Sequence, residues 1–167
     1  MLGEAYLEAM RSVLRHPQLD PAFKELVLTL PSETYIAEQL DVVDPQRVHL
    51  VREAMRAQLA TALFGDWQQA YEAHHDTGAY SPDPLSSGRR ALAGMALNFL
   101  CLAARSSGDT VWPGKTLQRF KDAGNMTDRF NALNALVSSG HTLAAQALAR
   151  FHACLLYTSD AADDSLR

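Results

Sequence analysis

Cysteine is scarce in this sequence, with only Cys101 and Cys154 among 167 residues. Two cysteines give no disulfide framework, so we expect a reducing compartment, with the cytoplasm as the predicted location. A long hydrophobic run is also missing, because the most apolar stretch, 91–104, contains Gly94 and Asn98 and is too short to cross a bilayer. The N-terminus lacks the basic and apolar regions of a signal peptide. These absences predict a soluble chain with no membrane partner.

An excess of basic residues is lacking as well. Fifteen lysines and arginines stand against nineteen aspartates and glutamates, which gives a formal net charge of −4. No stretch gathers basic side chains on one face, as the sequence of a nucleic-acid-binding domain would. We therefore expect no nucleic-acid partner.

Strand patterns are absent too, since no stretch alternates apolar and polar residues for long. Helical patterns take their place. Aspartate precedes proline at Asp20 and at Asp44, which puts a capping carboxylate before a proline at the first helical position, where the missing N–H costs nothing. After Asp44 the apolar residues recur at intervals of three and four, which predicts an amphipathic helix over 45–63.

The same criteria predict the remaining helices. Ser32 and Thr127 are the expected N-caps of two of them. Glycine and proline mark loops over 77–88 and 106–114. The predicted helices span 3–15, 21–29, 33–40, 45–63, 67–74, 89–105, 114–122 and 128–138, and a last one begins near 142.

Short helices joined by tight, capped turns favour an all-α domain of antiparallel pairs. No fixed repeat period emerges from the sequence. The predicted architecture is therefore an irregular array of helix pairs, HEAT- or armadillo-like in shape.

Six histidines raise the question of a metal site. His74 and His75 are adjacent and therefore point in different directions on a helix. Neither has a histidine or carboxylate four residues away to complete a chelating pair. The other four are scattered singly along the chain: His16, His49, His141 and His152. We predict structural roles for all six and no metal-binding residue.

Candidate catalytic groups are equally isolated. Cys101 is a nucleophile in principle, but its apolar neighbours supply no base or cation to lower its pKa. Two carboxylate pairs could be drawn for acid–base work, although capping and solvation explain them more simply; they are Glu33 with Glu38 and Asp41 with Asp44. The stretch SSGRR, 86–90, offers two arginines at an expected helix start, which is a weak signal for anion binding. We predict no catalytic and no cofactor-binding residue.

Two stretches carry a more specific signal than any spacing. Residues 30–63, LPSETYIAEQLDVVDPQRVHLVREAMRAQLATAL, closely resemble the opening of the helical C-terminal domain of bacterial aminopeptidase N, the zinc-dependent alanyl aminopeptidase family. Residues 122–133, DAGNMTDRFNAL, resemble a second block of that domain, in similar order and at a plausible distance. Agreement over so long a run is specific, whereas the loop between the two blocks is less typical of the family.

The resemblance implies a metallopeptidase, a hydrolase that removes N-terminal residues from peptides. In that family an H-E-x-x-H helix and a more distant glutamate hold zinc, and a G-x-M-E-N segment binds the free amino group of the substrate. Neither motif occurs here, so no catalytic or metal residue carries over. What does carry over is architecture: stacked helix pairs form a bowl that covers the catalytic domain and limits peptide access, with Asp44 and Thr127 as caps. The expected partners are the catalytic domain and the remaining C-terminal helices of the same protein.

The resemblance stops at Cys154. Residues 154–164, CLLYTSDAADD, match the in-frame translation of the mosaic end of a transposase-based sequencing adapter and its continuation. We therefore expect 154–167 to be an artefactual tail, with a genuine disordered acidic tail as the other interpretation. Residues 1–153 are then expected to be a truncated part of the helical domain.

Two other functions stay open. A free-standing helical interaction module would bind a partner peptide in an exposed groove. A complete small hydrolase would use Cys101 or a histidine, and it is the least favoured because no partner residues are in place. We expect a non-catalytic fragment of a zinc aminopeptidase, inactive on its own.

Overall fold

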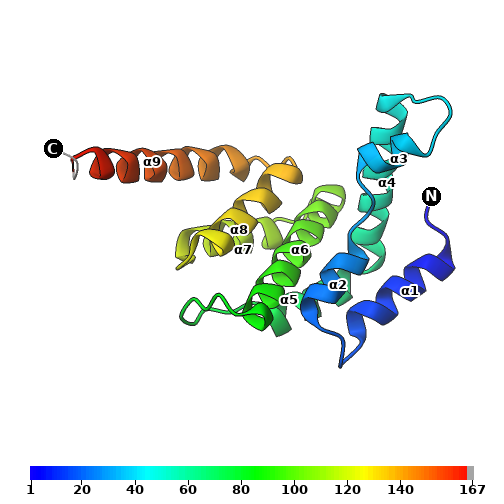
Figure 1. The fold of residues 1–167 in the computed structure, drawn as a ribbon, viewed down its shortest axis with the longest axis horizontal. Helices are drawn as coiled ribbons and strands as arrows, with labels where there is room; N and C mark the ends of the chain where they lie inside the picture. The colour runs from blue at the N-terminus through cyan, green and yellow to red at the C-terminus, as the bar shows by residue number, and fades with distance from the viewer. Residues whose placement is uncertain (165–167) are drawn as a thin grey trace.

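A computed structural model describes the backbone of residues 1–164 and the side chains of residues 1–156. Over these residues the chain forms nine α-helices and no strand (Figure 1). The helices are α1 (Glu4–Arg15), α2 (Pro21–Leu28), α3 (Glu33–Glu38), α4 (Pro45–Ala62), α5 (Phe64–His74), α6 (Pro84–Ser107), α7 (Val111–Asp122), α8 (Met126–Ser138) and α9 (Leu143–Asp164). The all-α prediction is confirmed. None of the described helices is long and apolar enough to cross a membrane.

Three predicted N-caps form as expected. The Asp20 carboxylate accepts a hydrogen bond from the Ala22 N–H at 2.8 Å, and the Asp44 carboxylate accepts one from the Arg47 N–H at 3.1 Å. The Ser32 hydroxyl oxygen accepts from the backbone N–H three residues later, at 3.1 Å. Each bond satisfies one of the backbone donors that a helix start leaves without an intrahelical partner.

The predicted cap of α8 was wrong. Thr127 lies inside the helix, and Asn125 is the N-cap, with its side-chain oxygen accepting from the Asp128 N–H at 2.9 Å. Asn125 also donates to the Asp128 carboxylate at 2.7 Å. The side chains of Asn125 and Asp128 are thus tied together, and this arrangement starts the helix at Met126, two residues before the predicted position.

Three other helices begin earlier than predicted, and the first of them, α5, starts at Phe64 instead of residue 67. α6 starts at Pro84, inside the expected loop 77–88, because the Asp83 carboxylate accepts from the Ser86 N–H at 2.9 Å. This is the same aspartate–proline device that starts α2 and α4. α7 starts at Val111, inside the expected loop 106–114, and its first N–H donates to the Asp109 carboxylate at 2.9 Å.

α6 is the centre of the fold. It contacts α2, α4, α5, α7 and α8, and Figure 1 shows it in the middle of the array. The Trp67 ring of α5 stacks on the Phe99 ring of α6 with centroids 4.4 Å apart, and the Trp67 indole N–H donates to the Leu59 carbonyl at 3.2 Å. These contacts bury a tryptophan while pairing its one polar group, which is the arrangement a core favours.

Two glycines of α6 allow neighbouring helices to approach closely. A Cβ at Gly94 would lie 2.6 Å from the Asn131 side-chain nitrogen of α8, and a Cβ at Gly88 would lie 3.0 Å from the Ala22 backbone nitrogen of α2. A larger residue at Gly94 would displace the Asn131 side chain, and one at Gly88 would press on the backbone of α2. Both contacts fix helices that line the cavity described below.

α9 runs away from the other helices, at one edge of the array (Figure 1). Its contacts are with α7 and α8, through a small cluster that includes Leu136 and Ala147. The helix passes through Cys154 without a break and ends at Asp164. The origin of 154–167 in a sequencing adapter concerns the DNA and stays a prediction.

Candidate functional site

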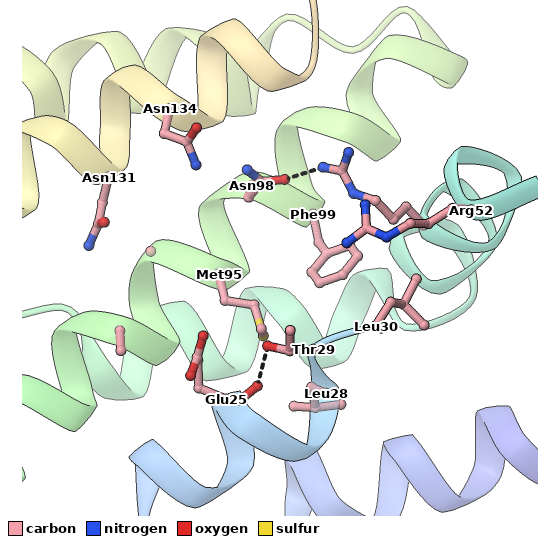
Figure 2. Close-up of a pocket in the computed structure, with 13 residues that line it drawn as sticks. Glu25, Leu28, Thr29, Leu30, Arg52, Met95, Asn98, Phe99, Asn131 and Asn134 are labelled. Atoms are coloured by element: carbon pink, nitrogen blue, oxygen red, sulfur yellow. Dashed lines mark hydrogen bonds between the residues drawn. The ribbon is translucent and has the colours of Figure 1, made fainter. Parts of the chain in front are cut away.

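A cavity with a volume of ≈390 Å³ lies between α2, α4, α6 and α8 (Figure 2). Charged and amide side chains from all four helices line it, over a floor formed in part by Met95 and Phe99. The charged and amide lining residues are Glu25, Arg52, Arg56, Asn98, Asn131 and Asn134. A cavity of this size, to which polar and apolar side chains contribute about equally, is large enough for a small ligand.

A chain of hydrogen bonds holds one wall of the cavity in place. Arg56 donates from Nη1 to the Glu53 carboxylate at 2.8 Å and from Nη2 to the Asn98 side-chain oxygen at 2.9 Å. Asn98 then donates to the Ser138 hydroxyl at 2.7 Å, and that hydroxyl donates to the Asn134 carbonyl at 2.6 Å. The network links α4, α6 and α8, so the orientation of the Asn98 amide is determined by both of its partners.

The Arg52 guanidinium is farther from the Glu53 carboxylate than the Arg56 guanidinium is. Its Nε donates to the Pro31 carbonyl at 2.8 Å, which anchors the guanidinium to the segment before α3. The Glu53 carboxylate is 4.0 Å from Nη1, at the limit of an ion pair, whereas the same carboxylate is only 2.8 Å from Arg56. Among the described residues, no acceptor lies within hydrogen-bonding distance of Arg52 Nη2. The Arg52 side chain is 23% exposed, so this charge borders the cavity while part of its stem is buried.

The α8 side contributes two amides. Asn131 donates a long hydrogen bond of 3.3 Å to the Arg90 carbonyl, which leaves its side-chain oxygen available. Asn134 is exposed, and Figure 2 shows it across the cavity mouth from Asn98. On the α2 side, Glu25 brings a half-buried carboxylate. The site therefore combines a guanidinium, a carboxylate and several amide groups.

Cys101 has no catalytic environment. Its thiol is fully buried and lies 3.2 Å from the Thr116 hydroxyl. Burial raises the pKa of the Cys101 thiol to about 11, which the Thr116 hydrogen bond only partly offsets. A thiolate is the reactive form, so this cysteine is a core residue rather than a nucleophile.

The histidines bind backbone groups or single side chains. The Nδ1 atoms of His74 and His75 lie 2.8 and 3.0 Å from the carbonyls of Ala70 and Tyr71. Burial is the main cause that lowers the pKa of His74. Within the described residues, no group of three or more histidine, cysteine, aspartate or glutamate side chains is placed to hold a metal ion.

The acidic candidates are also separated. Glu33 lies 2.8 Å from His49 Nδ1, and Asp44 caps α4. Glu38 and Asp41 are exposed, and no hydrogen bond joins either of the two proposed carboxylate pairs in the described part of the chain.

The stretch 86–90, a weak signal for anion binding in the sequence, lies next to an anionic side chain in the structure. These residues lie in the first two turns of α6, and the Asp83 carboxylate already occupies the helix start. Hydrogen bonds from Ser81 and Ser86 lower the pKa of Asp83 well below its ordinary value, so the group at the helix start is an anion. Arg90 packs over the Tyr80 ring at 4.6 Å and donates to the Ser81 carbonyl at 2.7 Å.

Sequence reasoning did not single out the cavity residues. A signal was nevertheless present: Asn131 and Asn134 are three apart and Arg52 and Arg56 four apart, so each pair shares a helix face. Asn98 is a polar residue in the most apolar helix. What the sequence does not show is that these three helix faces meet.

A second hollow, ≈720 Å³ in volume, lies between α3 and α4 and is mainly apolar. Its walls include Leu40, Val42 and Val51, of which Val42 is 86% exposed. An exposed apolar surface of this kind is typical of a face that packs on another protein segment.

Comparison with known proteins identifies relatives over most of the chain. A family model described as "Domain of unknown function (DUF3458_C) ARM repeats" matches residues 1–158. Aminopeptidase N of Escherichia coli is 33% identical over 132 residues, which cover 79% of this chain and 15% of the relative. Aminopeptidase N of Caulobacter vibrioides is 31% identical over 149 residues, which cover 89% of this chain and 17% of the relative. The resemblance expected from 30–63 and 122–133 is confirmed.

Among solved structures, the crystal structure of Legionella pneumophila aminopeptidase A in complex with aspartic acid is similar, with a TM-score of 0.72. The match covers 91% of this chain and 18% of that one, at 21% identity, and so supports the fold alone. The armadillo-type helical array predicted from the sequence agrees with the ARM-repeat family. The chain spans less than a fifth of the length of the two curated relatives.

Proposed function

The chain belongs to the DUF3458_C family of ARM-repeat domains, and on that premise we propose that it serves a zinc-dependent aminopeptidase as a non-catalytic helical domain. In this role it covers the catalytic domain and limits which peptides reach it. The observation that carries the proposal is the similarity to aminopeptidase N over 79% and 89% of the chain in two bacteria.

The described residues offer no binding site for the zinc ion of such an enzyme. The described side chains include no cluster of metal-binding residues. The Nδ1 atoms of the adjacent His74 and His75 lie within hydrogen-bonding distance of backbone carbonyls. No H-E-x-x-H sequence is present. Zinc and the residues that hydrolyse the peptide therefore belong, in this proposal, to another part of the parent protein.

The helices themselves supply a rigid wall. α6 is packed on five other helices, and the α3–α4 hollow leaves an apolar face uncovered. A rigid array with one unpaired apolar face suits a domain that packs against a larger body. We propose that the catalytic domain and further helices of the same protein are the partners, peptides are the substrates, and the cytoplasm is the location.

The test begins with the source DNA and ends with an assay. The reading frame upstream of Met1 is sequenced, and we expect an H-E-x-x-H segment in the same frame. The product of the complete reading frame should then hydrolyse L-alanyl-p-nitroanilide, lose activity with a chelator and regain it with zinc. A frame that contains no metal-binding segment, or a product that is inactive in the presence of zinc, would contradict the proposal.

The same DNA also tests the tail and the alternative function. Adapter codons from Cys154 onward would confirm that 154–164 are artefactual. If the codons differ and a natural stop follows Arg167, the free-standing interaction module becomes the better interpretation, with the α3–α4 hollow as its binding surface.

A further inference from the structure

We propose that the cavity between α2, α4, α6 and α8 binds an extended peptide through a carboxylate of that peptide, with Arg52 as the carboxylate-binding residue. The inference rests on the proposed function only in taking such a peptide to be a substrate of the parent protein. Binding itself follows from the chemistry of the cavity wall.

Arg52 has the free hydrogen-bonding capacity that a carboxylate needs. Its Nε is anchored on the Pro31 carbonyl, which restricts the orientation of the planar guanidinium. Arg56 is paired with Glu53 and Asn98, but no described acceptor bonds to Arg52 Nη2. A guanidinium that is anchored on one edge and open on another presents N–H donors in a geometry that matches a carboxylate.

The amides match the main chain of an extended peptide. A peptide unit offers one N–H donor and one carbonyl acceptor, and an asparagine side chain offers the complementary pair. Asn134 makes no side-chain hydrogen bond within the described residues, and Asn131 keeps its oxygen available beyond the long bond to Arg90. Asn98 is held in one orientation by Arg56 and Ser138, so it is a fixed contact rather than an adaptable one.

Charge argues against a polyanionic ligand such as a nucleotide. Glu25 borders the cavity, and Glu53 neutralises Arg56 next to it. Only Arg52 is left to oppose a negative ligand, and a triphosphate would meet the carboxylate of Glu25. A peptide with one carboxylate meets less of this repulsion, and its main-chain N–H groups can donate to Glu25.

Size and floor suit a short stretch of peptide. The volume of ≈390 Å³ lies near the lower end of the usual range for ligand sites, about 300–1,000 Å³. Met95 and Phe99 at the floor offer an apolar contact for one side chain. Met95 is flexible enough to adapt to different side chains, so the site would read the main chain and the carboxylate rather than one residue type.

The experiment measures binding by fluorescence anisotropy to the product of the complete reading frame. The probe is tetra-alanine with fluorescein on its N-terminus, which an aminopeptidase cannot cleave because the amino group is blocked. Three forms are compared: a free C-terminal carboxylate, a C-terminal amide, and an amide in which one internal alanine is aspartate. We expect the free acid to bind at least about tenfold more tightly than the plain amide.

The third probe distinguishes two sources of the carboxylate. If only the free acid binds more tightly than the plain amide, the carboxylate is that of the peptide C-terminus. If only the aspartate-containing amide does, it is that of an acidic side chain, and if both do, Arg52 accepts either. Equal affinity of all three probes would overturn the inference.

Variants locate the site. Arg52→Gln should raise the Kd of the acid by about tenfold and leave that of the amide nearly unchanged. Asn134→Ala should raise the Kd of both by about threefold, since it removes a neutral hydrogen-bonding group. Arg47→Gln is the matched control and should change neither, because this exposed arginine of the same helix lines the α3–α4 hollow and not the cavity.

Folding and function are monitored separately. Arg52→Gln also loses the bond to Pro31, so its thermal melt is compared with that of the wild type, while Asn134→Ala breaks no side-chain hydrogen bond. An unchanged Kd in both variants would overturn the inference even if L-alanyl-p-nitroanilide is hydrolysed. Conversely, carboxylate-dependent binding without any hydrolysis would support the site and contradict the aminopeptidase proposal.

Discussion

α6 and α9 are the two longest helices of the chain, with 24 and 22 residues, and both are rich in alanine and leucine. α6 is surrounded by five helices and buries most of its length, whereas α9 contacts α7 and α8 and is otherwise exposed over its described side chains. The two helices are thus similar in length and in their apolar residue types, and their environments are opposite. The comparison teaches that helix formation is local, while the contribution of a helix to the core depends on its neighbours.

The largest expected effect compares one leucine from each helix. Leu100 of α6 is 0% exposed and Leu148 of α9 is 47% exposed. Leu100→Ala leaves a cavity in the core and should lower the free energy of unfolding by about 2–5 kcal/mol. Leu148→Ala should change it by less than about 0.5 kcal/mol. Urea denaturation monitored by circular dichroism measures both, and equal losses would show that α9 is packed as tightly as α6.

A smaller effect is expected at the α6–α8 contact. Gly94→Ala places a methyl group against Asn131 and should destabilise the chain by about 1–2 kcal/mol. Gly114→Ala in α7 is the matched control, because its added methyl group meets nothing within 4 Å. The control should stabilise by up to about 1 kcal/mol, since alanine has the higher helix propensity. Thermal melts of the two variants should therefore shift in opposite directions, and a shared direction would refute the close contact.

The start of α8 allows a test of the corrected cap. Asn125→Ala removes the acceptor of the Asp128 N–H and should cost about 1 kcal/mol. Thr127→Ala lies within the first turn and should cost less than about 0.5 kcal/mol. The urea midpoints of the two variants are the measurement. A larger loss for Thr127→Ala would restore the cap predicted from the sequence.

The two cysteines differ in burial as the two helices that carry them do, and their thiol reactivity measures this difference. Burial raises the pKa of Cys101 in α6 to about 11, so at pH 8 roughly one thiol in a thousand would be ionised. Cys154 in α9 is only half-buried. At pH 8, Ellman's reagent should therefore modify Cys154 quickly in the folded chain and Cys101 only in denaturant. Any slow reaction of Cys101 in the folded chain should increase as the pH approaches 11, because burial shifts its ionisation to higher pH, whereas in denaturant this shift is lost. The Cys154→Ser variant identifies which thiol reacts, and a fast remaining reaction would show that Cys101 is accessible.

Sequence reasoning located the helices better than it located their ends. The capping devices at Asp20, Ser32 and Asp44 are local, since each joins residues two or three apart, and the structure confirms them. The same device at Asp83 was overlooked because glycine and proline around it suggested a loop. Asn125 and Thr127 are both good capping residues, and no local rule decides between them.

The candidate site could not have been predicted in the same way. Arg56 and Asn98 are 42 residues apart in sequence, and Asn98 and Ser138 are 40 apart. Each lies on a helix whose polar face is unremarkable by itself. Only the packing of α4 and α8 on opposite sides of α6 brings these side chains to one wall, and sequence periodicity contains no information on which helices pack together.

The sequence by itself determined that this protein is all-α, where most of its helices lie, and which family it belongs to. These properties follow from caps, apolar spacing and two blocks that resemble the family, all of which are readable within a turn or a short run of residues. The tertiary structure alone decided that α6 is central, that α9 lies at the edge, and that Arg52 faces a cavity with an unpaired edge of its guanidinium. The physical reason is that burial and hydrogen bonding across the array depend on distant segments, whereas helix formation depends mainly on near ones.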